Sequence, residues 1–154
     1  MKTNGEVIYK KRRAYMGNIS IILPDNISLN SSGSTYEDGM EIRDIDTNSR
    51  IYIQNESYEE SIKEYFDFRR GESTEIFSDV IPVSRNELNG YYMMYANDYY
   101  EYCDYCFDLR EYDDKFTMLN IAVEIRKGDV SIKTVMKSKK MKKLIKSLRL
   151  ENQK

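Results

Sequence analysis

The 154-residue chain contains no histidine and no tryptophan, and it has only two cysteines, two prolines and seven glycines. Without histidine the chain has no histidine general base, no Ser-His or Cys-His pair and no histidine metal ligand. Two cysteines are too few for a four-cysteine zinc site or a self-contained iron–sulfur site. The glycines form neither GxGxxG nor GxxxxGK[ST], the fingerprints of nucleotide-binding loops. The acidic residues show no spacing that singles out a catalytic pair. We therefore expect a protein that is not an enzyme, with no cofactor and no metal.

Long apolar runs are also missing. The longest run near the N-terminus is Ile21-Ile22-Leu23, which Pro24 ends. No stretch approaches the ~20 apolar residues that span a bilayer, and no apolar segment of a signal peptide follows the basic residues at the start. We expect a cytoplasmic protein without a membrane span, or an exported protein if a leader precedes this sequence in its natural context.

Charge is unevenly distributed along the chain. Residues 1–36 carry five basic and two acidic side chains, residues 37–114 carry seven basic and 21 acidic, and residues 115–154 carry twelve basic and three acidic. The fold can bring the basic ends back against the acidic middle, so that the charges neutralise one another. Alternatively, the domain presents an acidic face and a basic helix, and such fields steer charged partners.

Hydrophobic periodicity predicts an α+β fold, in which an antiparallel β-sheet meander carries two main helices. The predicted element order is β-β-β-α-β-β-β-β-α. We expect a basic N-terminal arm over residues 1–17, a single domain over residues 18–149 and a polar tail over residues 150–154. The predicted strands cover residues 18–23, 40–45, 50–54, 76–84, 91–96, 99–110 and 116–127.

The first helix is predicted over residues 57–70. Ser57-Tyr-Glu-Glu60 matches a capping box, in which the serine hydroxyl and the glutamate satisfy free amides at the helix start. Gly71 is a natural stop. The apolar stripe expected to face the sheet consists of Tyr58, Ile62, Tyr65 and Phe66.

The C-terminal helical segment carries two apolar stripes that lie on opposite sides of one straight helix. The first contains Ile132 and Val135, and the second contains Met141 and Leu144. A straight helix cannot bury both against one surface, so we predict a break near residues 137–140 with Ser138 as a cap. Six lysines lie between residues 137 and 146. They form either a solvated face or a docking surface for an acidic partner.

Two short motifs allow local predictions. Asn89-Gly90 is a signal for a tight turn that leads into the strand beginning at Tyr91. Cys103-Asp-Tyr-Cys106 lies in a segment that alternates apolar and polar residues, which predicts a strand. Residues three apart on a strand face opposite sides, so the two thiols are not a redox or metal pair. We expect Cys103 in the core and Cys106 partly exposed.

Three segments resemble the PsbP-like family, which includes the Mog-type proteins and has an α+β sandwich fold. Ile19-Ser-Ile-Ile-Leu-Pro-Asp25 is similar to the first strand and turn of that family, although Asn26 stands where glycine is usual. Leu88-Asn-Gly90 resembles its central hairpin, and Lys143-Leu-Ile-Lys-Ser-Leu-Arg149 resembles its terminal helix. The resemblance implies a non-catalytic binding or accessory module, and it carries over no catalytic residue.

Tyrosine and acidic residues concentrate in one part of the chain. Eight of the 14 tyrosines lie between Tyr91 and Tyr112, among several acids. Tyrosine is favoured at protein interfaces, and neighbouring acids suit a basic partner and repel nucleic acid. We predict a protein-binding module, of the immunity-protein or phage-inhibitor kind, whose acidic face masks a basic protein surface. The alternative is an exported PsbP-like accessory module that binds a partner or small ligand. The predicted partner-binding residues are Tyr99, Tyr100, Glu101, Tyr102 and Asp104.

Overall fold

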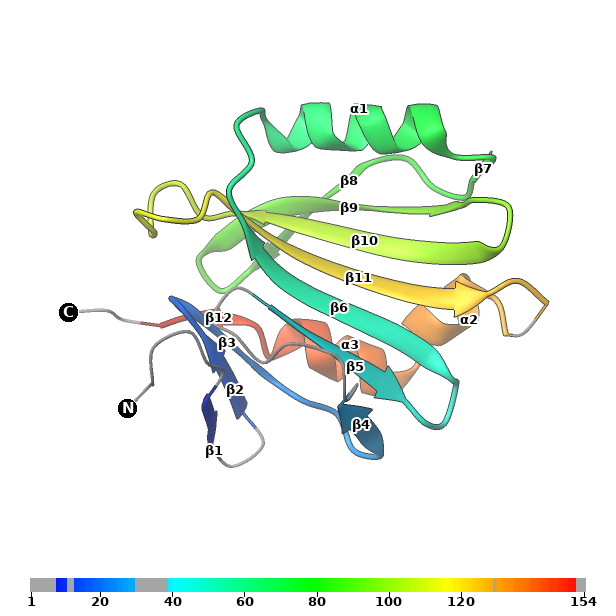
Figure 1. Cartoon of the computed structure of the whole chain (residues 1–154), viewed down its shortest axis with the longest axis horizontal. Coiled ribbons are helices and arrows are strands. Elements are labelled where there is room, and N and C mark those ends of the chain that lie inside the picture. Colours follow the sequence, from blue (N-terminus) through cyan, green and yellow to red (C-terminus); the bar gives the residue numbers. More distant parts are fainter. Residues whose placement is uncertain (1–7, 11–12, 30–38, 129, 152–154) are drawn as a thin grey trace.

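The computed structural model describes residues 8–10, 13–29, 39–128 and 130–151, and in these residues sheets dominate an α+β fold (Figure 1). A small antiparallel sheet has the strand order β1-β2-β3-β12. A larger antiparallel sheet has the order β4-β5-β6-β11-β10-β9-β7, and β8 also pairs with β9. The small sheet contains β1 (Ile8–Lys10), β2 (Arg13–Met16), β3 (Ile19–Ile22) and β12 (Arg149–Leu150). The large sheet contains β4 (Ile27–Leu29), β5 (Gly39–Asp44), β6 (Ser49–Glu56), β7 (Glu75–Ile76), β8 (Ile81–Arg85), β9 (Leu88–Ala96), β10 (Tyr100–Asp108) and β11 (Met118–Arg126).

Three helices accompany these sheets: α1 (Ile62–Glu72), α2 (Ile132–Lys137) and α3 (Lys139–Lys146). Helix α1 packs on β9 and β10, whereas α2 packs on β10 and β11 and α3 packs on β3 (Figure 1). The large sheet is not the simple meander that the sequence predicts, because β6 pairs with β11 instead of with the next strand along the chain. After β6 the chain passes through α1 to the far edge of the sheet and then returns strand by strand to β6.

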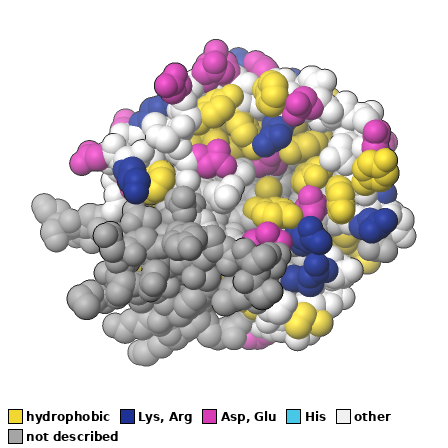
Figure 2. Space-filling model, viewed as in Figure 1, with side chains coloured by type: hydrophobic (Ala, Val, Ile, Leu, Met, Phe, Trp, Pro, Cys, Tyr) yellow, Lys and Arg dark blue, Asp and Glu magenta, His cyan; other side chains and the backbone are white. Residues whose placement is uncertain are grey.

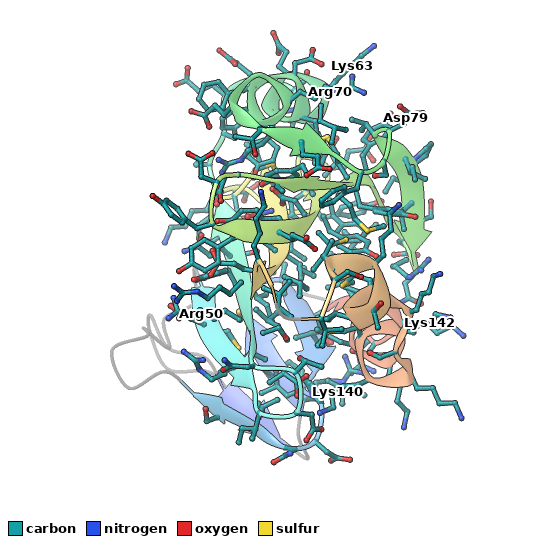
Figure 3. All side chains as sticks on the ribbon, turned by 90° about the vertical axis from the view of Figure 1, so that its right-hand side faces the viewer. Arg50, Lys63, Arg70, Asp79, Lys140 and Lys142 are labelled. Atoms are coloured by element: carbon teal, nitrogen blue, oxygen red, sulfur yellow. The ribbon has the colours of Figure 1, made fainter. Side chains whose placement is uncertain are left out.

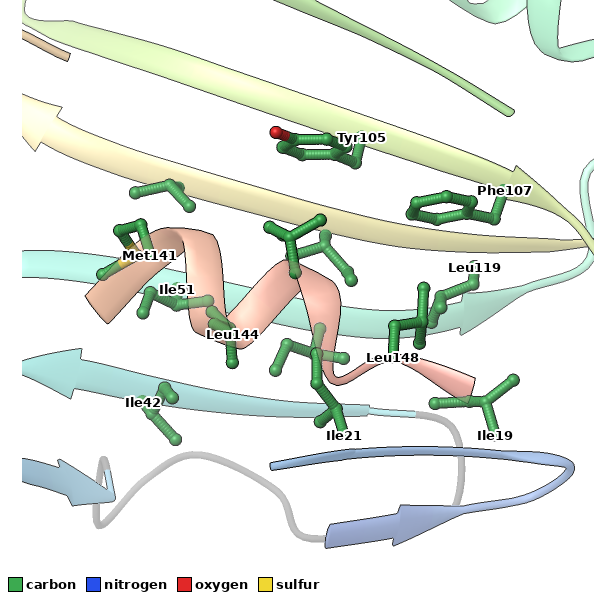
Figure 4. Packing of buried hydrophobic residues seen from close by; sticks show 14 of the residues in the cluster. Ile19, Ile21, Ile42, Ile51, Tyr105, Phe107, Leu119, Met141, Leu144 and Leu148 are labelled. Atoms are coloured by element: carbon green, nitrogen blue, oxygen red, sulfur yellow. The ribbon is translucent and has the colours of Figure 1, made fainter. Parts of the chain in front are cut away.

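Strict alternation along the strands builds the main core. Ile51 and Ile53 on β6, with Leu119 and Ile121 on β11, are fully buried on the face of the large sheet that α2 and α3 cover. Figure 4 shows Leu144 and Leu148, from α3 and the residues after it, packed between this face and the small sheet. Val123 and Ile125 of β11 share this face with Leu119 and Ile121. We call this the inner face and the opposite one the outer face.

The predicted break in the C-terminal helical segment is confirmed at Ser138. Its backbone N–H donates to the carbonyl of Val135 at the end of α2, and its side chain accepts from the backbone N–H of Met141 in the first turn of α3. Ser138 is thus the C-cap of one helix and the N-cap of the next. The change in axis allows both apolar stripes to enter the same core.

The predicted start of the first helix is wrong by one turn. Ser61 is the N-cap of α1 and forms a complete capping box with Glu64. Ser57 instead donates its hydroxyl to the carbonyl of Lys115 at 3.0 Å. Ile62, Tyr65 and Phe66 are buried as predicted, whereas Tyr58 precedes the helix and is half-buried. The helix does not begin at Ser57 because the backbone of Glu56 and Tyr58 is still bonded to Thr117, just before β11.

The predicted tight turn at Asn89-Gly90 is also wrong. The turn lies at residues 86–87, where Asn86 adopts a left-handed φ of 57°, and both Asn89 and Gly90 lie inside β9. Glycine is required at position 90 for steric reasons, since a Cβ at this position would lie 1.9 Å from the carbonyl oxygen of Cys106. The residue permits close approach of β9 and β10.

The predicted boundaries of the domain differ from those of the structure at both ends of the described chain. Ala14 and Met16 on β2 are fully buried, so residues 13–16 belong to the core and not to an arm. Leu150, placed in the tail by the sequence, lies in β12. The strand predicted over residues 76–84 is two short edge strands, β7 and β8. Residues 1–7 and 11–12 of the predicted arm, residues 152–154 of the predicted tail and residues 30–38 lie outside the described residues.

Candidate binding pocket

The outer face of the large sheet carries a polar pocket of about 450 Å³ beside α1. The pairing register places Ala122 of β11 between Tyr52 of β6 and Asp104 of β10. The small side chain of Ala122 leaves space between these larger neighbours, and all three residues line the pocket. The charged residues that line it are Glu56, Arg69, Glu72 and Asp104, and its tyrosines are Tyr52, Tyr65, Tyr95 and Tyr102. Figure 2 shows acidic side chains gathered along the edge of the molecule where α1 lies.

Asp104 forms the floor of the pocket and is only 1% exposed. One carboxylate oxygen accepts hydrogen bonds from the hydroxyls of Tyr65 at 2.9 Å and Tyr95 at 3.1 Å. The other oxygen accepts from the side-chain amide of Asn120. Burial raises the pKa of Asp104, and these three donors oppose that shift. The carboxyl group is therefore held by partners on three elements: α1, β9 and β11.

Arg69 extends from α1 over this network. Its Nε donates to the hydroxyl of Tyr65 at 3.1 Å and lies 3.9 Å from the carboxylate of Asp104. Its guanidinium lies over the Tyr65 ring, 5.0 Å from the ring centroid, which is a cation–π arrangement. The side chain is 38% exposed, so the guanidinium lies at the mouth of the pocket and not at its floor.

The tyrosines provide a rigid aromatic wall. Tyr95 and Tyr102 are opposite each other on neighbouring strands, and their rings stack with centroids 5.2 Å apart. The hydroxyl of Tyr102 accepts from the side-chain amide of Asn97 at 3.3 Å. Burial raises the pKa of Tyr65, Tyr95 and Tyr102 well above the usual tyrosine value. These phenols therefore remain neutral at physiological pH and keep their hydrogens for bonding.

The pocket has more carboxyl groups than cations. Glu56 is half-buried, and its pKa is raised first by desolvation and then by the charge of Asp104, against the effect of Arg69. Glu72 lies 3.8 Å from Arg69 and is exposed. Among the described residues, three carboxyl groups thus line the pocket with one guanidinium.

The structure does not bring the five predicted partner-binding residues onto one surface. Tyr102 and Asp104 line the pocket, and Tyr100 lies on the same side of β10, with its ring centroid 6.4 Å from that of Tyr102. Glu101 points to the inner face, where its carboxylate accepts from the backbone N–H of Ile132 at 2.8 Å. Tyr99 is 71% exposed in the turn before β10. The role of these residues in partner binding remains a prediction.

Several pocket residues are not predicted from the sequence, because they lie on elements other than β10. Tyr52 and Glu56 lie on β6, Arg69 lies on α1, and Asn120 lies on β11. Asn120 could be recognised as a candidate from the sequence, since its polar amide interrupts the apolar residues at the start of β11. Its side chain donates both to Asp104 and to the backbone carbonyl of Tyr105.

The two cysteines face opposite sides of β10, as predicted. Cys103 lies in the inner core, and Cys106 lies under α1 with Phe66 and Met118. The expectation that Cys106 is partly exposed is wrong, because α1 covers it completely. Burial raises the pKa of both thiols, so neither is an activated nucleophile.

None of the helices in the described part of the chain has the length and apolar character that crossing a membrane requires. The described residues also contain no group of three or more cysteine, aspartate or glutamate side chains suited to hold a metal ion. Comparisons with protein-family models, with curated proteins and with solved structures find no match for this chain. The resemblance to the PsbP-like family therefore remains a prediction.

Proposed function

We propose that this chain is a non-catalytic protein-binding module whose outer-face pocket receives a basic side chain of a partner protein. The observation that carries the proposal is the position of Arg69, which lies over the Tyr65 ring and next to Asp104. The chain thus already holds one guanidinium on a tyrosine beside a carboxylate. The rest of the pocket offers the same chemistry to a second cation, through the Tyr95–Tyr102 pair and Glu56.

The chemistry of Asp104 supports binding over catalysis. Both of its carboxylate oxygens already accept hydrogen bonds, from two tyrosine hydroxyls and one amide. A general base must instead reach a substrate proton, whereas Asp104 is only 1% exposed. Asp104 therefore acts as a fixed acceptor that orients the hydroxyls of Tyr65 and Tyr95. An acidic site of this kind suits an inhibitor of the immunity-protein or phage type, which masks a basic surface on its target.

A titration with a defined basic peptide tests the proposal. The probe is an arginine–glycine peptide, and the control peptide has citrulline in place of arginine, which keeps the shape and removes the charge. Backbone amide spectra of the ¹⁵N-labelled protein should shift at β6, β10 and the end of α1 with arginine and not with citrulline. Equal responses to the two peptides would contradict the proposal.

A matched pair of tyrosine variants locates the effect. Tyr102→Ala removes a pocket wall, whereas Tyr91→Ala removes a 40% exposed tyrosine on the same sheet that does not line the pocket. We expect Tyr102→Ala to weaken peptide binding by about 1–2 kcal/mol, the usual effect of an aromatic anchor, and Tyr91→Ala to leave it unchanged. Loss of binding in both variants would place the contact elsewhere on the sheet.

A second candidate function is an accessory module that holds a small polar ligand, as the PsbP-like resemblance implies. The pocket volume of about 450 Å³ and the amides of Gln54, Asn97 and Asn120 favour it. The same titration, run with neutral sugars and nucleosides, separates the two candidates. Saturable binding of a neutral compound, with no response to the arginine peptide, would favour the accessory module.

A further inference from the structure

A second pocket, of opposite charge, lies beyond the inner face of the large sheet. It has a volume of about 560 Å³ and is lined by residues of α3, the end of β3 and the segment that follows β3. Its apolar lining comes from Ile22, Leu23, Pro24 and Leu144. Ile22 is 41% exposed, which leaves an apolar side chain open on the pocket wall. We call this pocket, which lysines of α3 line, the lysine groove. Because α3 packs on the opposite side of the sheet from Arg69 and Tyr102, the lysine groove is independent of the proposed basic-side-chain site.

Hydrogen bonds connect the elements at the base of the lysine groove. The side chain of Ser147 accepts from the backbone N–H of Ile22 at 2.8 Å and donates to the carbonyl of Leu144 at 2.7 Å. Arg13 on β2 also donates to the backbone carbonyl of Ser147 at 3.1 Å and to the hydroxyl of Ser20 at 2.8 Å. Strand β3 and the end of α3 are thus joined directly, so the groove is part of the packed fold.

Within the described residues, the charge of the lysine groove is only partly compensated. Four of the lysines of α3 line it, together with the carboxylate of Asp25. Lys140 is held by the buried carboxylate of Asp44 at 2.7 Å and by Asp46. Within the residues that the structure describes, the other three lysines form no ion pair. These three exposed lysines are Lys139, Lys143 and Lys146.

We propose that the lysine groove binds an acidic peptide segment of a partner protein. Carboxylates of the segment would pair with Lys143 and Lys146, and an apolar side chain would cover Ile22. Charge complementarity selects an acidic ligand, and the apolar lining selects one with a hydrophobic side chain. A nucleic-acid strand fits less well, because the described residues that line the groove include neither an aromatic ring nor an arginine for stacking.

The experiment uses the full chain and a fluorescent peptide in which glutamates surround one leucine. Fluorescence anisotropy gives the dissociation constant, and a second peptide with glutamine in place of glutamate controls for charge. The test variant is the double substitution Lys143→Gln and Lys146→Gln. The matched control is Lys133→Gln and Lys142→Gln, which removes the same charge from exposed lysines outside the groove. Figure 3 shows Lys142 pointing away from the sheets.

We expect the test variant to weaken binding by about tenfold or more, because charge-assisted contacts are lost, and the control variant to change it by about twofold or less. Ile22→Ser should also weaken binding, through loss of apolar contact. The same loss in both double variants would show diffuse attraction to the helix and overturn the proposal. So would tighter binding to anionic lipid vesicles or to a DNA duplex than to the acidic peptide, or no saturable peptide binding by the unmodified chain. The outer-face pocket is intact in all these variants, so failure here leaves the proposed function unaffected.

Discussion

Strand β10 presents different chemistry to the two faces of the large sheet. Cys103 and Phe107 face the inner core, where α2, α3 and the small sheet cover them with apolar side chains. Tyr102 and Asp104 face the outer pocket, where they meet hydroxyls, an amide and a guanidinium. An apolar face needs only to exclude water, whereas a buried carboxylate is tolerated only when its oxygens have donors. The inner face therefore belongs to the larger apolar core, and the outer face adds polar groups to a smaller apolar cluster under α1.

Truncation of the inner face should have the largest effect. Phe107 is fully buried, and Phe107→Ala should lower the free energy of unfolding by about 3–5 kcal/mol, through lost burial and the cavity left behind. The measurement is urea denaturation followed by circular dichroism. Tyr99→Ala, at an exposed position, is the control and should change the free energy by about 0.5 kcal/mol or less. A loss below about 1 kcal/mol for Phe107→Ala would show that the inner face is not the main core.

Removal of the buried charge on the outer face should have the next largest effect. Asp104→Asn replaces an acceptor of three hydrogen bonds with a group that is half donor, and should lower the free energy of unfolding by about 1–3 kcal/mol. Tyr102→Phe is a matched control, because it keeps the ring and leaves the hydrogen bonds of Asp104 intact. A variant as stable as the unmodified chain would mean that the polar network contributes nothing to folding.

The effect of Asp104→Asn has a defined pH dependence. Burial raises the pKa of Asp104 in the folded chain above its value in the unfolded chain. The folded state then binds the proton more tightly, so the contribution of Asp104 to stability decreases as the pH rises from the unfolded pKa to the folded pKa. The substituted asparagine side chain cannot titrate, so the stability difference between the unmodified chain and Asp104→Asn should shrink as the pH rises through this window. A difference that grows with pH would show that the donors outweigh burial.

Removal of the true helix cap should have a smaller effect. Ser61→Ala breaks the capping box of α1 and should lower the free energy of unfolding by about 1 kcal/mol. Ser57→Ala is the matched control, since Ser57 only donates to an exposed carbonyl, and it should cost about 0.5 kcal/mol or less. Thermal or urea denaturation measures the free energy of unfolding of both variants and shows which serine caps the helix. A larger loss of stability in Ser57→Ala than in Ser61→Ala would support a helix start at Ser57, as the sequence predicts.

Neutralisation of the half-buried pocket acid should have the smallest effect on stability. Desolvation and the charge of Asp104 both disfavour the ionised form of Glu56, so Glu56→Gln should leave stability within about 0.5 kcal/mol of the unmodified chain. The same change should weaken binding of the arginine peptide by about 0.5–1 kcal/mol, because a glutamine side chain cannot ionise beside a bound guanidinium. Glu87→Gln, at an exposed turn, should change neither quantity. Unchanged peptide binding in Glu56→Gln would exclude Glu56 from the site.

Local patterns determined much of the fold. Alternation placed Cys103 and Cys106 on opposite faces of a strand, and the phase shift between two apolar stripes placed a break at Ser138. Both predictions are confirmed because they depend on geometry within one strand or one helix. Pro82 lies in the edge strand β8, a position where a sheet tolerates a residue without a backbone N–H.

Tertiary structure decided between local signals of equal quality. Ser57 and Ser61 are each followed three residues later by glutamate, so both match a capping box. Only a start at Ser61 leaves the backbone carbonyl of Tyr58 free to accept from the hydroxyl of Thr117 at 2.9 Å, next to β11. In a helix beginning at Ser57 that carbonyl would accept from the backbone N–H of Ile62 instead. Likewise, Asn86 and Asn89 are both suited to a turn, and the register of β9 against β10 assigned the turn to Asn86.

The sequence alone determined that tyrosines and acids concentrate around β10, and it identified Tyr102 and Asp104 among them. It did not determine that Tyr52, Arg69 and Asn120 complete a pocket with them, because these residues come from β6, α1 and β11. Alternation assigns a side chain to a face, but only strand order and register determine its neighbours across the sheet. The pairing of β6 with β11, which follows from the path of the chain through α1, is the tertiary contact that placed Tyr52 two strands from Asp104.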